Sequence, residues 1–361
     1  MMGKMNGLSL DLIVHPGETI KEVIEDRNMT QEELAIRTGY SAKHVSEVIS
    51  GKKSISSRFA NSLEYALNIP TEFWINLQGI YDKEVCELEN INNISSIELE
   101  ISNDLKDIVK YCEKNNIMPC SSNKQITVLN LRKFLNVTNL NKIPSLPFQQ
   151  MAFRGSKKNK VNIYVLHAWK KICEHLTEKI SVVNSFDKEK LKLKYDDIKK
   201  TMFLPIDQMV EKLKEIFLDC GIVFEIVKHF TGAPVQGFIQ KKDDKVILCM
   251  TIRQSFSDIF WFTLFHEIAH LVNEDFLNQY VDYNFVESEA EKKADTFARN
   301  ILINENDYKE FLQKGNIKYI DIKNFASSQN VLPGIVIGRL QNDMKDYTFL
   351  TKYKEQYKWN Y

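Results

Sequence analysis

The hydrophobic positions near the N-terminus predict three short helices separated by clear stops. Thr30 and Glu33 have the spacing of a capping box, so a first helix is expected over residues 31–38. Ser41 offers the N-cap of a second helix over residues 42–50. The apolar face of the third helix is formed by Phe59, Ala60, Leu63, Ala66 and Leu67. This segment is therefore expected to form a small all-α domain.

The pattern weakens after this region. Residues 86–103 have no clear helical or strand period, and we interpret them as a linker that contains a domain boundary. Beyond them, helical spacing returns in four stretches, 105–112, 128–135, 163–176 and 191–200. We therefore expect a helical middle region that carries no recognisable motif.

The hydrophobic pattern of the C-terminal part predicts both helices and strands. A helix over residues 206–219 precedes a strand over 221–227, which is rich in branched and aromatic residues. Two further strands, 235–240 and 245–250, flank a polar turn. We expect these strands to form a small antiparallel sheet.

A helix that is apolar almost all round follows the sheet and is expected to be buried. It should begin at a cap formed by Ser257 or Asp258. Near the end of the chain, residues 320–341 have the outline of a helix hairpin, which we interpret as packing for the C-terminal domain.

Composition limits the class of protein. A chain of 361 residues with 43% hydrophobic and 27% charged residues is expected to form two or three folded domains, which excludes global disorder. We place the domains at 1–85, 86–205 and 206–361, in an α+β fold that is mostly α. The formal net charge is zero, so a polyanion site must be local.

Location follows from what the sequence lacks. The chain has no export signal and no apolar run long enough to cross a membrane, so no membrane partner is expected. Its six cysteines contain no C-x-x-C pair, which is typical of a reducing compartment. The sequence therefore predicts a cytoplasmic protein.

The buried helix contains the motif H-E-x-x-H. His266 and His270 are four residues apart and share one helix face, so both can bind one zinc ion while Glu267 lies beside them. An H-E-x-x-H motif occurs by chance in roughly one chain of this length in a hundred. The context strengthens the motif, because two imidazoles on a buried helix need partners.

A hydrolytic zinc site needs a third protein ligand. On the next predicted helix, Glu287 and Glu291 fall on or beside an apolar stripe, whereas Glu289 points away. Asp295, one turn after Glu291, could hold the second ring nitrogen of a ligating histidine, which favours Glu291. The alternative for these glutamates is a first helical turn that complements the helix dipole.

The second N-terminal helix carries the residue types of a DNA-reading helix. Lys43, His44 and Glu47 lie where base edges would be read, and Gln31 starts the preceding helix, where a phosphate would lie. Ser41, Ala42, Lys52 and Lys53 complete the candidate DNA-binding set. Residues 43–58 have a net charge of plus three, although residues 1–84 have minus three. The alternative is a plain three-helix domain with solvated lysines.

The N-terminal segment resembles the HigA-type branch of Xre/Cro helix-turn-helix regulators. The resemblance covers about residues 13–84 and rests on H-P-G-E at 15–18, T-Q-E-E-L-A at 30–35, residues 41–52 and F-W-I-N-L-Q at 73–78. It implies binding to a double-stranded DNA operator as a homodimer, and often control of a toxin operon. One module alone covers little DNA, which also favours a dimer.

The C-terminal segment resembles the ImmA/IrrE metallopeptidases, which are gluzincin-like. The resemblance spans about residues 210–345 and rests on F-T-L-F-H-E-I-A-H at 262–270 and E-x-x-A-D-x-F-A at 291–298. It implies that His266, His270 and Glu291 bind zinc, that Glu267 is the general base, and that the substrate is a repressor, an antitoxin or a toxin. The alternative is an antitoxin whose metal domain is a non-catalytic toxin-binding module.

Overall fold

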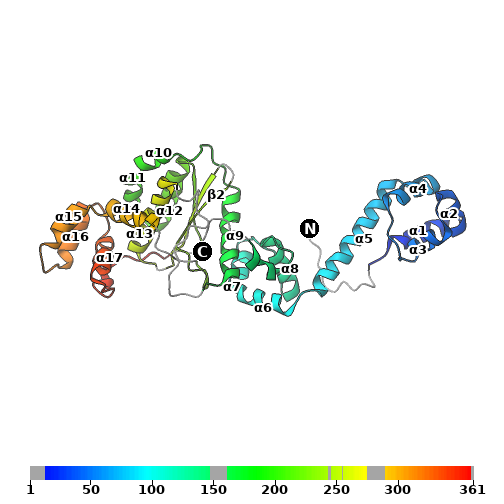
Figure 1. Ribbon diagram of the computed structural model, residues 1–361, viewed down its shortest axis with the longest axis horizontal. Helices are drawn as coiled ribbons and strands as arrows, with labels where there is room; N and C mark the ends of the chain where they lie inside the picture. Colours follow the sequence, from blue (N-terminus) through cyan, green and yellow to red (C-terminus); the bar gives the residue numbers. More distant parts are fainter. Residues whose placement is uncertain (1–12, 147–160, 243–244, 254, 275–288, 359–361) are drawn as a thin grey trace. The chain divides into compact units, whose positions relative to one another are not determined.

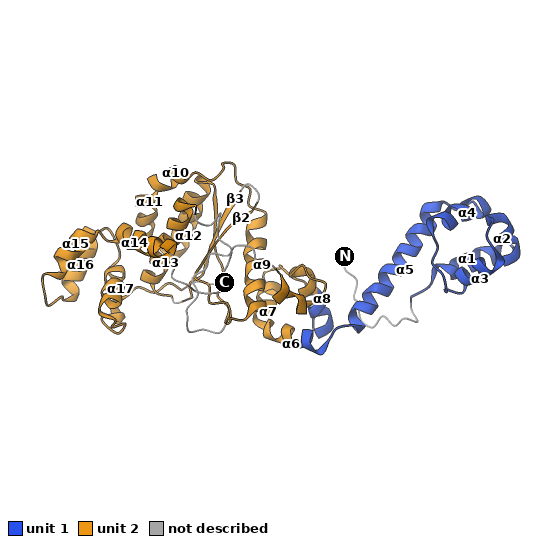
Figure 2. Ribbon diagram, in the orientation of Figure 1, with its two compact units in different colours: residues 1–99, 121–129 blue, residues 100–120, 130–361 orange. Residues whose placement is uncertain are grey.

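A computed structural model describes residues 13–146, 161–242, 245–253, 255–274 and 289–358, most of which are helical (Figure 1). The chain divides into two compact units (Figure 2). Unit 1 comprises residues 1–99 and 121–129, and unit 2 comprises residues 100–120 and 130–361. None of the helices in the described ranges is both long and apolar enough to cross a membrane.

Unit 1 begins with five helices whose ends follow the predicted caps. They are α1 (Pro16–Asp26), α2 (Gln31–Thr38), α3 (Ala42–Ile49), α4 (Ser57–Leu67) and α5 (Thr71–Asn92). The hydroxyl of Thr30 accepts from Glu33 N at 3.1 Å, and Ser41 Oγ accepts from His44 N at 3.2 Å. Gly39 ends α2 with a φ of 73°, which favours glycine. Only the Thr30 half of the predicted capping box forms, because the Glu33 carboxylate accepts hydrogen bonds from Arg37 and not from the backbone of Thr30.

The core of unit 1 forms where α2, α3 and α4 meet the first turns of α5. Trp74 is fully buried among aliphatic side chains of the other helices. The amide oxygen of Gln78 accepts from Ile55 N at 2.8 Å and so fixes the turn before α4. These contacts give α3 a rigid position within the unit.

Residues 86–103 are mostly helical and do not form the linker or loosely packed segment that the sequence predicts, although the first segment of unit 1 ends within them, at Leu99. Helix α5 continues to Asn92, and α6 (Ser96–Asp104) follows after a short turn. Leu88 of α5 and Ile101 of α6 are buried at helical positions between polar neighbours, and such packing supplies most of the stability of a helix in a protein. The expected helical middle is confirmed by α7 (Lys106–Lys114), α8 (Lys124–Phe134), α9 (Ile163–Glu178), α10 (Lys188–Leu193) and α11 (Tyr195–Lys200).

The sheet of unit 2 is mixed and not antiparallel as expected. It contains β1 (Ile222–Ile226), β2 (Gly237–Lys242) and β3 (Lys245–Met250), in the order β1-β3-β2. The predicted hairpin β2–β3 is antiparallel, but β1 pairs with β3 in parallel. The reason is the connection over residues 227–236, which carries the chain to the far side of β3 and leaves β2 at the edge.

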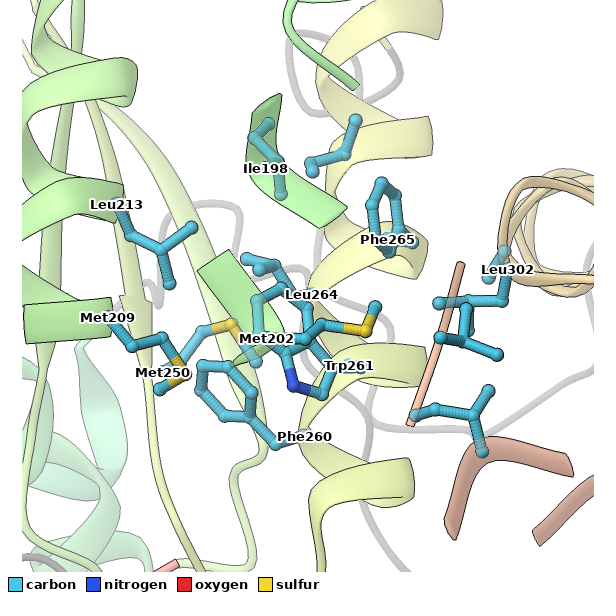
Figure 3. Packing of buried hydrophobic residues seen from close by; sticks show 14 of the residues in the cluster. Ile198, Met202, Met209, Leu213, Met250, Phe260, Trp261, Leu264, Phe265 and Leu302 are labelled. Carbon is cyan, nitrogen blue, oxygen red and sulfur yellow. The ribbon is translucent and has the colours of Figure 1, made fainter. Parts of the chain in front are cut away.

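Helices cover both faces of this sheet. On one face, α12 (Ile206–Asp219) and α13 (Ser257–Asn273) contribute the large apolar cluster shown in Figure 3, in which Phe260, Trp261, Leu264 and Phe265 come from α13. On the other face, the rings of Trp169 of α9 and Phe238 lie 5.9 Å apart. The central strand β3 is apolar from Val246 to Met250, where it is buried on both sides.

Helix α13 begins differently from the prediction. Its N-cap is Phe256, and neither Ser257 nor Asp258 caps it through a side chain. Instead, Ser257 N donates to Glu355 O at 3.0 Å, and Asp258 forms an ion pair with Lys354 at 2.7 Å. The last described residues therefore hold the start of the motif helix.

The remaining helices pack against α13 or extend from it. They are α14 (Glu289–Leu302), α15 (Glu305–Leu312), α16 (Tyr319–Ser328) and α17 (Pro333–Met344), with short 3-10 turns at Leu140–Ser145, Thr201–Phe203 and Thr351–Tyr353. The expected hairpin near the end of the chain is confirmed by α16 and α17, which contact each other. Among them, α14 forms the most extensive contact with α13.

Candidate metal centre and nucleic-acid interface

The structure brings His266, His270 and Glu291 together at the contact between α13 and α14. The two histidines are only 1% exposed, because α13 is surrounded by apolar contacts. The side chain of Glu291 comes from the first turn of α14 and is 36% exposed. One ligand atom from each of the three residues lies within 4.8 Å of the others.

The distances within this trio are equal to, or up to about 0.3 Å shorter than, those expected around a common cation. His266 Nε2 lies 3.0 Å from His270 Nε2 and 3.1 Å from Glu291 Oε2, and His270 Nε2 lies 3.3 Å from Glu291 Oε1. Zinc bonds of about 2.0–2.2 Å at tetrahedral angles hold ligand atoms about 3.3–3.6 Å apart. Two imidazole nitrogens and a carboxylate are also the donor types that zinc prefers.

Asp295 orients the first histidine. Its carboxylate oxygen lies 2.9 Å from His266 Nδ1. A neutral imidazole that donates from Nδ1 to a carboxylate directs the lone pair of Nε2 the other way, toward Glu291. Two acceptors then face each other at a buried position, which is unfavourable unless a cation or a proton lies between them.

Glu291 is held in its charged form. Burial alone would raise its pKa, but hydrogen bonds to His266 and His270 outweigh burial and bring the pKa well below its usual range. The carboxylate is therefore available as an anionic ligand at any physiological pH. Glu287, the alternative ligand, lies outside the described residues, and Glu289 is 81% exposed and forms an ion pair with Lys292.

Glu267 is 1% exposed and lies against the edge strand of the sheet. The contact is made at Gly237, the first residue of β2, where an added Cβ would lie 2.3 Å from Glu267 Oε1. Any larger residue would therefore displace the carboxylate from its position. The sequence analysis missed Gly237, whose only signal was a glycine at the start of a predicted strand.

The candidate DNA-binding residues are placed on the surface of unit 1 around α3. Ser41 caps the helix, and Ala42, Lys43, Lys52 and Lys53 are exposed. The side chain of Lys43 is 84% exposed, compared with 51% for that of Lys53. Ser46, which the sequence analysis missed, is exposed one turn after Ala42 and belongs to the same face.

Two of the predicted residues have other partners as well. The ring of His44 packs between Tyr40 and Phe59, with centroid distances of 4.6 and 5.0 Å, so it is half-buried. Glu47 forms an ion pair with Lys53 at 2.7 Å, and the hydrogen bond to that lysine lowers the pKa of Glu47. Gln31 is half-buried at the first position of α2.

Comparison with known proteins assigns the class of this region. Residues 20–74 match the family model described as helix-turn-helix (HTH_3). This part of the chain is therefore a helix-turn-helix domain, with α2 and α3 as its central pair. No curated protein matches the chain.

Solved structures of three antitoxin-type proteins are similar to part of the chain. The first is a putative antidote protein of a plasmid maintenance system from Nostoc punctiforme, which is 32% identical, covers 21% of this chain and 84% of its own, and has a TM-score of 0.21. The second is the Pseudomonas aeruginosa antitoxin HigA, solved with the higBA promoter, which is 26% identical, covers 22% of this chain and 86% of its own, and has a TM-score of 0.21. The third is a HigA-family addiction module antidote protein from Coxiella burnetii, which is 26% identical, covers 28% of this chain and 92% of its own, and has a TM-score of 0.20. The assignment of residues 20–74 as a helix-turn-helix domain rests on the family model alone.

Proposed function

We propose that the protein is a DNA-binding transcription regulator with a zinc-dependent endopeptidase domain that cleaves a partner regulatory protein, either a repressor, an antitoxin or a toxin. The observation that carries the peptidase half is the convergence of His266, His270 and Glu291 beside a buried Glu267. The resemblance of this region to ImmA/IrrE metallopeptidases supports the same reading. We place the protein in the cytoplasm, where operator DNA is accessible.

The chemistry assigned to the side chains is peptide hydrolysis. Zinc, when bound by the three ligands, would supply polarisation of the scissile carbonyl and acidification of a water molecule. Glu267 would act as the general base, accepting a proton from the attacking water and returning it to the leaving amine. Gly237 keeps the Glu267 carboxylate in one position, and Asp295 keeps the ring of His266 turned toward the ligand set.

Two surfaces near this site suit an extended peptide. Strand β2 is at the edge of the sheet, so its outer side offers backbone groups to an added strand. A cavity of about 360 Å³ runs along the N-terminal half of α13, where Ile259 and Phe262 line it together with Asp295 and Arg299. A substrate side chain next to the cleaved bond could enter this cavity.

For the helix-turn-helix domain we propose binding to a double-stranded DNA operator as a homodimer. The exposed residues of α3, Ala42, Lys43 and Ser46, would face base edges, while Lys52 and Lys53 would lie near phosphates. A second, symmetry-related copy would supply the contact area that one small module lacks.

The peptidase half is tested by expressing the chain with its genomic neighbours and following their proteins by mass spectrometry. We expect a fragment of one neighbour that disappears with Glu267→Gln, since general base catalysis contributes about 10²–10⁴-fold to rate. Glu289→Gln, an exposed substitution on α14, should leave the fragment unchanged. If every product and phenotype is the same with Glu267→Gln, the domain is a binding module and not an enzyme.

The DNA half is tested by selecting binders from a random double-stranded library and measuring gel shifts. Lys43→Ala should weaken binding by roughly 5- to 150-fold, the range for loss of one base contact. Lys83→Ala removes the same charge from α5, another helix of unit 1, and should have little effect. Equal losses of DNA affinity in the two variants would indicate nonspecific electrostatic attraction and not recognition of bases by α3.

A further inference from the structure

We propose that unit 2 contains a second binding site, for a small phosphorylated anion, in the cavity between α7 and residues 228–231. The cavity has a volume of about 240 Å³, and its polar lining comprises Asp107, Lys110, Lys114, Lys228, His229 and Thr231. None of these residues belongs to the metal centre or to the helix-turn-helix domain. The site therefore has a role beyond the proposed function.

The charge of the lining favours an anion. Three lysines oppose a single acid, Asp107. Lys110 and Lys114 are one helical turn apart on α7, so they lie on the same face of the helix. In the described ranges, the ion pairs include neither Lys110 nor Lys228. Lys228 Nζ lies 5.9 and 5.7 Å from the ring centres of Tyr111 and Phe230, contacts that leave its hydrogen-bond donors available to an anion.

His229 adds a neutral polar group to this wall. Burial lowers its pKa first, and the positive charge of Arg253 lowers it further, so the ring is uncharged near pH 7. One ring nitrogen hydrogen-bonds to the backbone of Ala233, and Nδ1 remains as an acceptor, which suits a hydroxyl group on the organic part of the ligand.

The wall formed by residues 228–233 is fixed by contacts that do not involve a ligand. Trp169 Nε1 donates to Lys228 O at 3.1 Å, and Asn162 N donates to Gly232 O at 2.8 Å. The ring of Phe230 packs edge-on against Tyr111 at 5.6 Å, and Lys228 Nζ lies 5.7 Å from the centre of the Phe230 ring. A loop held in this way loses little entropy when it binds.

The size and chemistry of the cavity indicate the class of ligand. Its volume is at the small end for a ligand pocket, which limits the occupant to a metabolite-sized molecule. Lysine ammonium groups act as point charges that suit phosphate, and the hydroxyl of Thr231 can donate to a further oxygen. A phosphate group with a short organic part satisfies all of these positions.

The test is isothermal titration of the full chain with glycerol 3-phosphate and inorganic phosphate, with succinate as the carboxylate control. We expect saturable binding of the phosphate compounds, and hydrogen-exchange protection confined to residues 106–114 and 228–233. Lys110→Ala and Lys228→Ala should each weaken binding by about 10-fold or more, the usual loss for a charge-assisted hydrogen bond. Lys110→Arg, which keeps the charge, should bind better than Lys110→Ala.

A matched control removes two lysines elsewhere in unit 2. Lys314→Ala with Lys323→Ala takes twice the charge of either single substitution from exposed positions and should still leave the affinity unchanged. The proposal is overturned if the wild-type chain binds neither phosphate compound, if succinate binds equally well, if the control variant loses as much affinity, or if the protected residues lie elsewhere.

Discussion

The metal centre and the DNA-facing surface of α3 hold their candidate side chains in opposite ways. In the metal centre, His266 and His270 are 1% exposed and are surrounded by polar partners at fixed distances. On α3, Lys43 is 84% exposed, and its nearest acid, Glu47, is 3.9 Å away. A buried polar group must be satisfied inside the protein, whereas an exposed one is satisfied by water.

The two sites therefore differ in how far burial fixes the positions of their side chains. Burial forces the metal ligands into one arrangement, so their geometry is informative before any ligand is bound. The exposed lysines of unit 1 have no such constraint, because water satisfies their charges. Substitutions should therefore have large, specific effects at the first site and smaller, graded effects at the second.

The largest effect is expected for Glu291→Ala. Loss of the only carboxylate in the ligand trio should reduce zinc affinity by more than about 100-fold, beyond the loss typical of an outer partner. Zinc should also cease to raise the melting temperature of the variant, because ligand-linked stabilisation follows affinity. Glu289→Ala on the same helix is the control, and equal zinc binding in the two variants would contradict the assignment of Glu291.

Gly237→Ala is expected to have the next largest effect. The new Cβ would lie 2.3 Å from Glu267 Oε1, so the carboxylate must move, and a shift of about 1 Å at a reacting group can cost about 100-fold in rate. Zinc content should stay at the wild-type level. Shortening the acid in the double variant Gly237→Ala with Glu267→Asp should restore part of the cleavage; a normal rate in Gly237→Ala would rule out its positioning role.

Asp295→Ala should have an intermediate effect. The substitution removes the acceptor that lies 2.9 Å from His266 Nδ1 and leaves the three ligands in place. Partners of ligating histidines typically contribute 10- to 100-fold to metal affinity. Competition with a fluorescent zinc chelator measures this loss. An unchanged affinity would show that α13 packing alone orients the ring.

The smallest effect is expected for His44→Ala in unit 1. Its ring contacts Tyr40 and Phe59, and each aromatic contact contributes about 0.5–1.5 kcal/mol, so unit 1 should lose about 1 kcal/mol or more of stability. Urea unfolding followed in the near-UV measures the change. If stability is unchanged while DNA binding falls, His44 acts on DNA and not through the core, as the sequence analysis first predicted.

The sequence was most informative where local signals act alone. The caps at Thr30 and Ser41 and the limits of α12 agree with the structure because they depend on a few neighbouring residues. The pairing of β1 with β3 depends on the route of residues 227–236, for which no local signal exists. The helices across residues 86–103 were missed for a similar reason, since a few buried side chains outweigh a polar composition.

The candidate metal centre shows the same division. Helical spacing placed His266 and His270 on one face. The apolar stripe of the next helix left Glu287 and Glu291 as candidates, and the position of Asp295 favoured Glu291, which the structure brings beside the histidines. The contact of Gly237 with Glu267 joins residues thirty positions apart in sequence, and no periodicity predicts it. On α3, spacing selected His44 as a reading residue, but the aromatic neighbours that hold its ring come from other parts of unit 1.

The central claim is that two histidines and one glutamate from successive helices hold a single divalent ion. Anomalous scattering at the zinc edge, from a crystal of the full chain grown with zinc, tests it directly. We predict one strong peak per chain, at about 2.0–2.2 Å from His266 Nε2, His270 Nε2 and a carboxylate oxygen of Glu291. A map without a peak between α13 and α14, or with zinc bound only at other residues, would contradict the account.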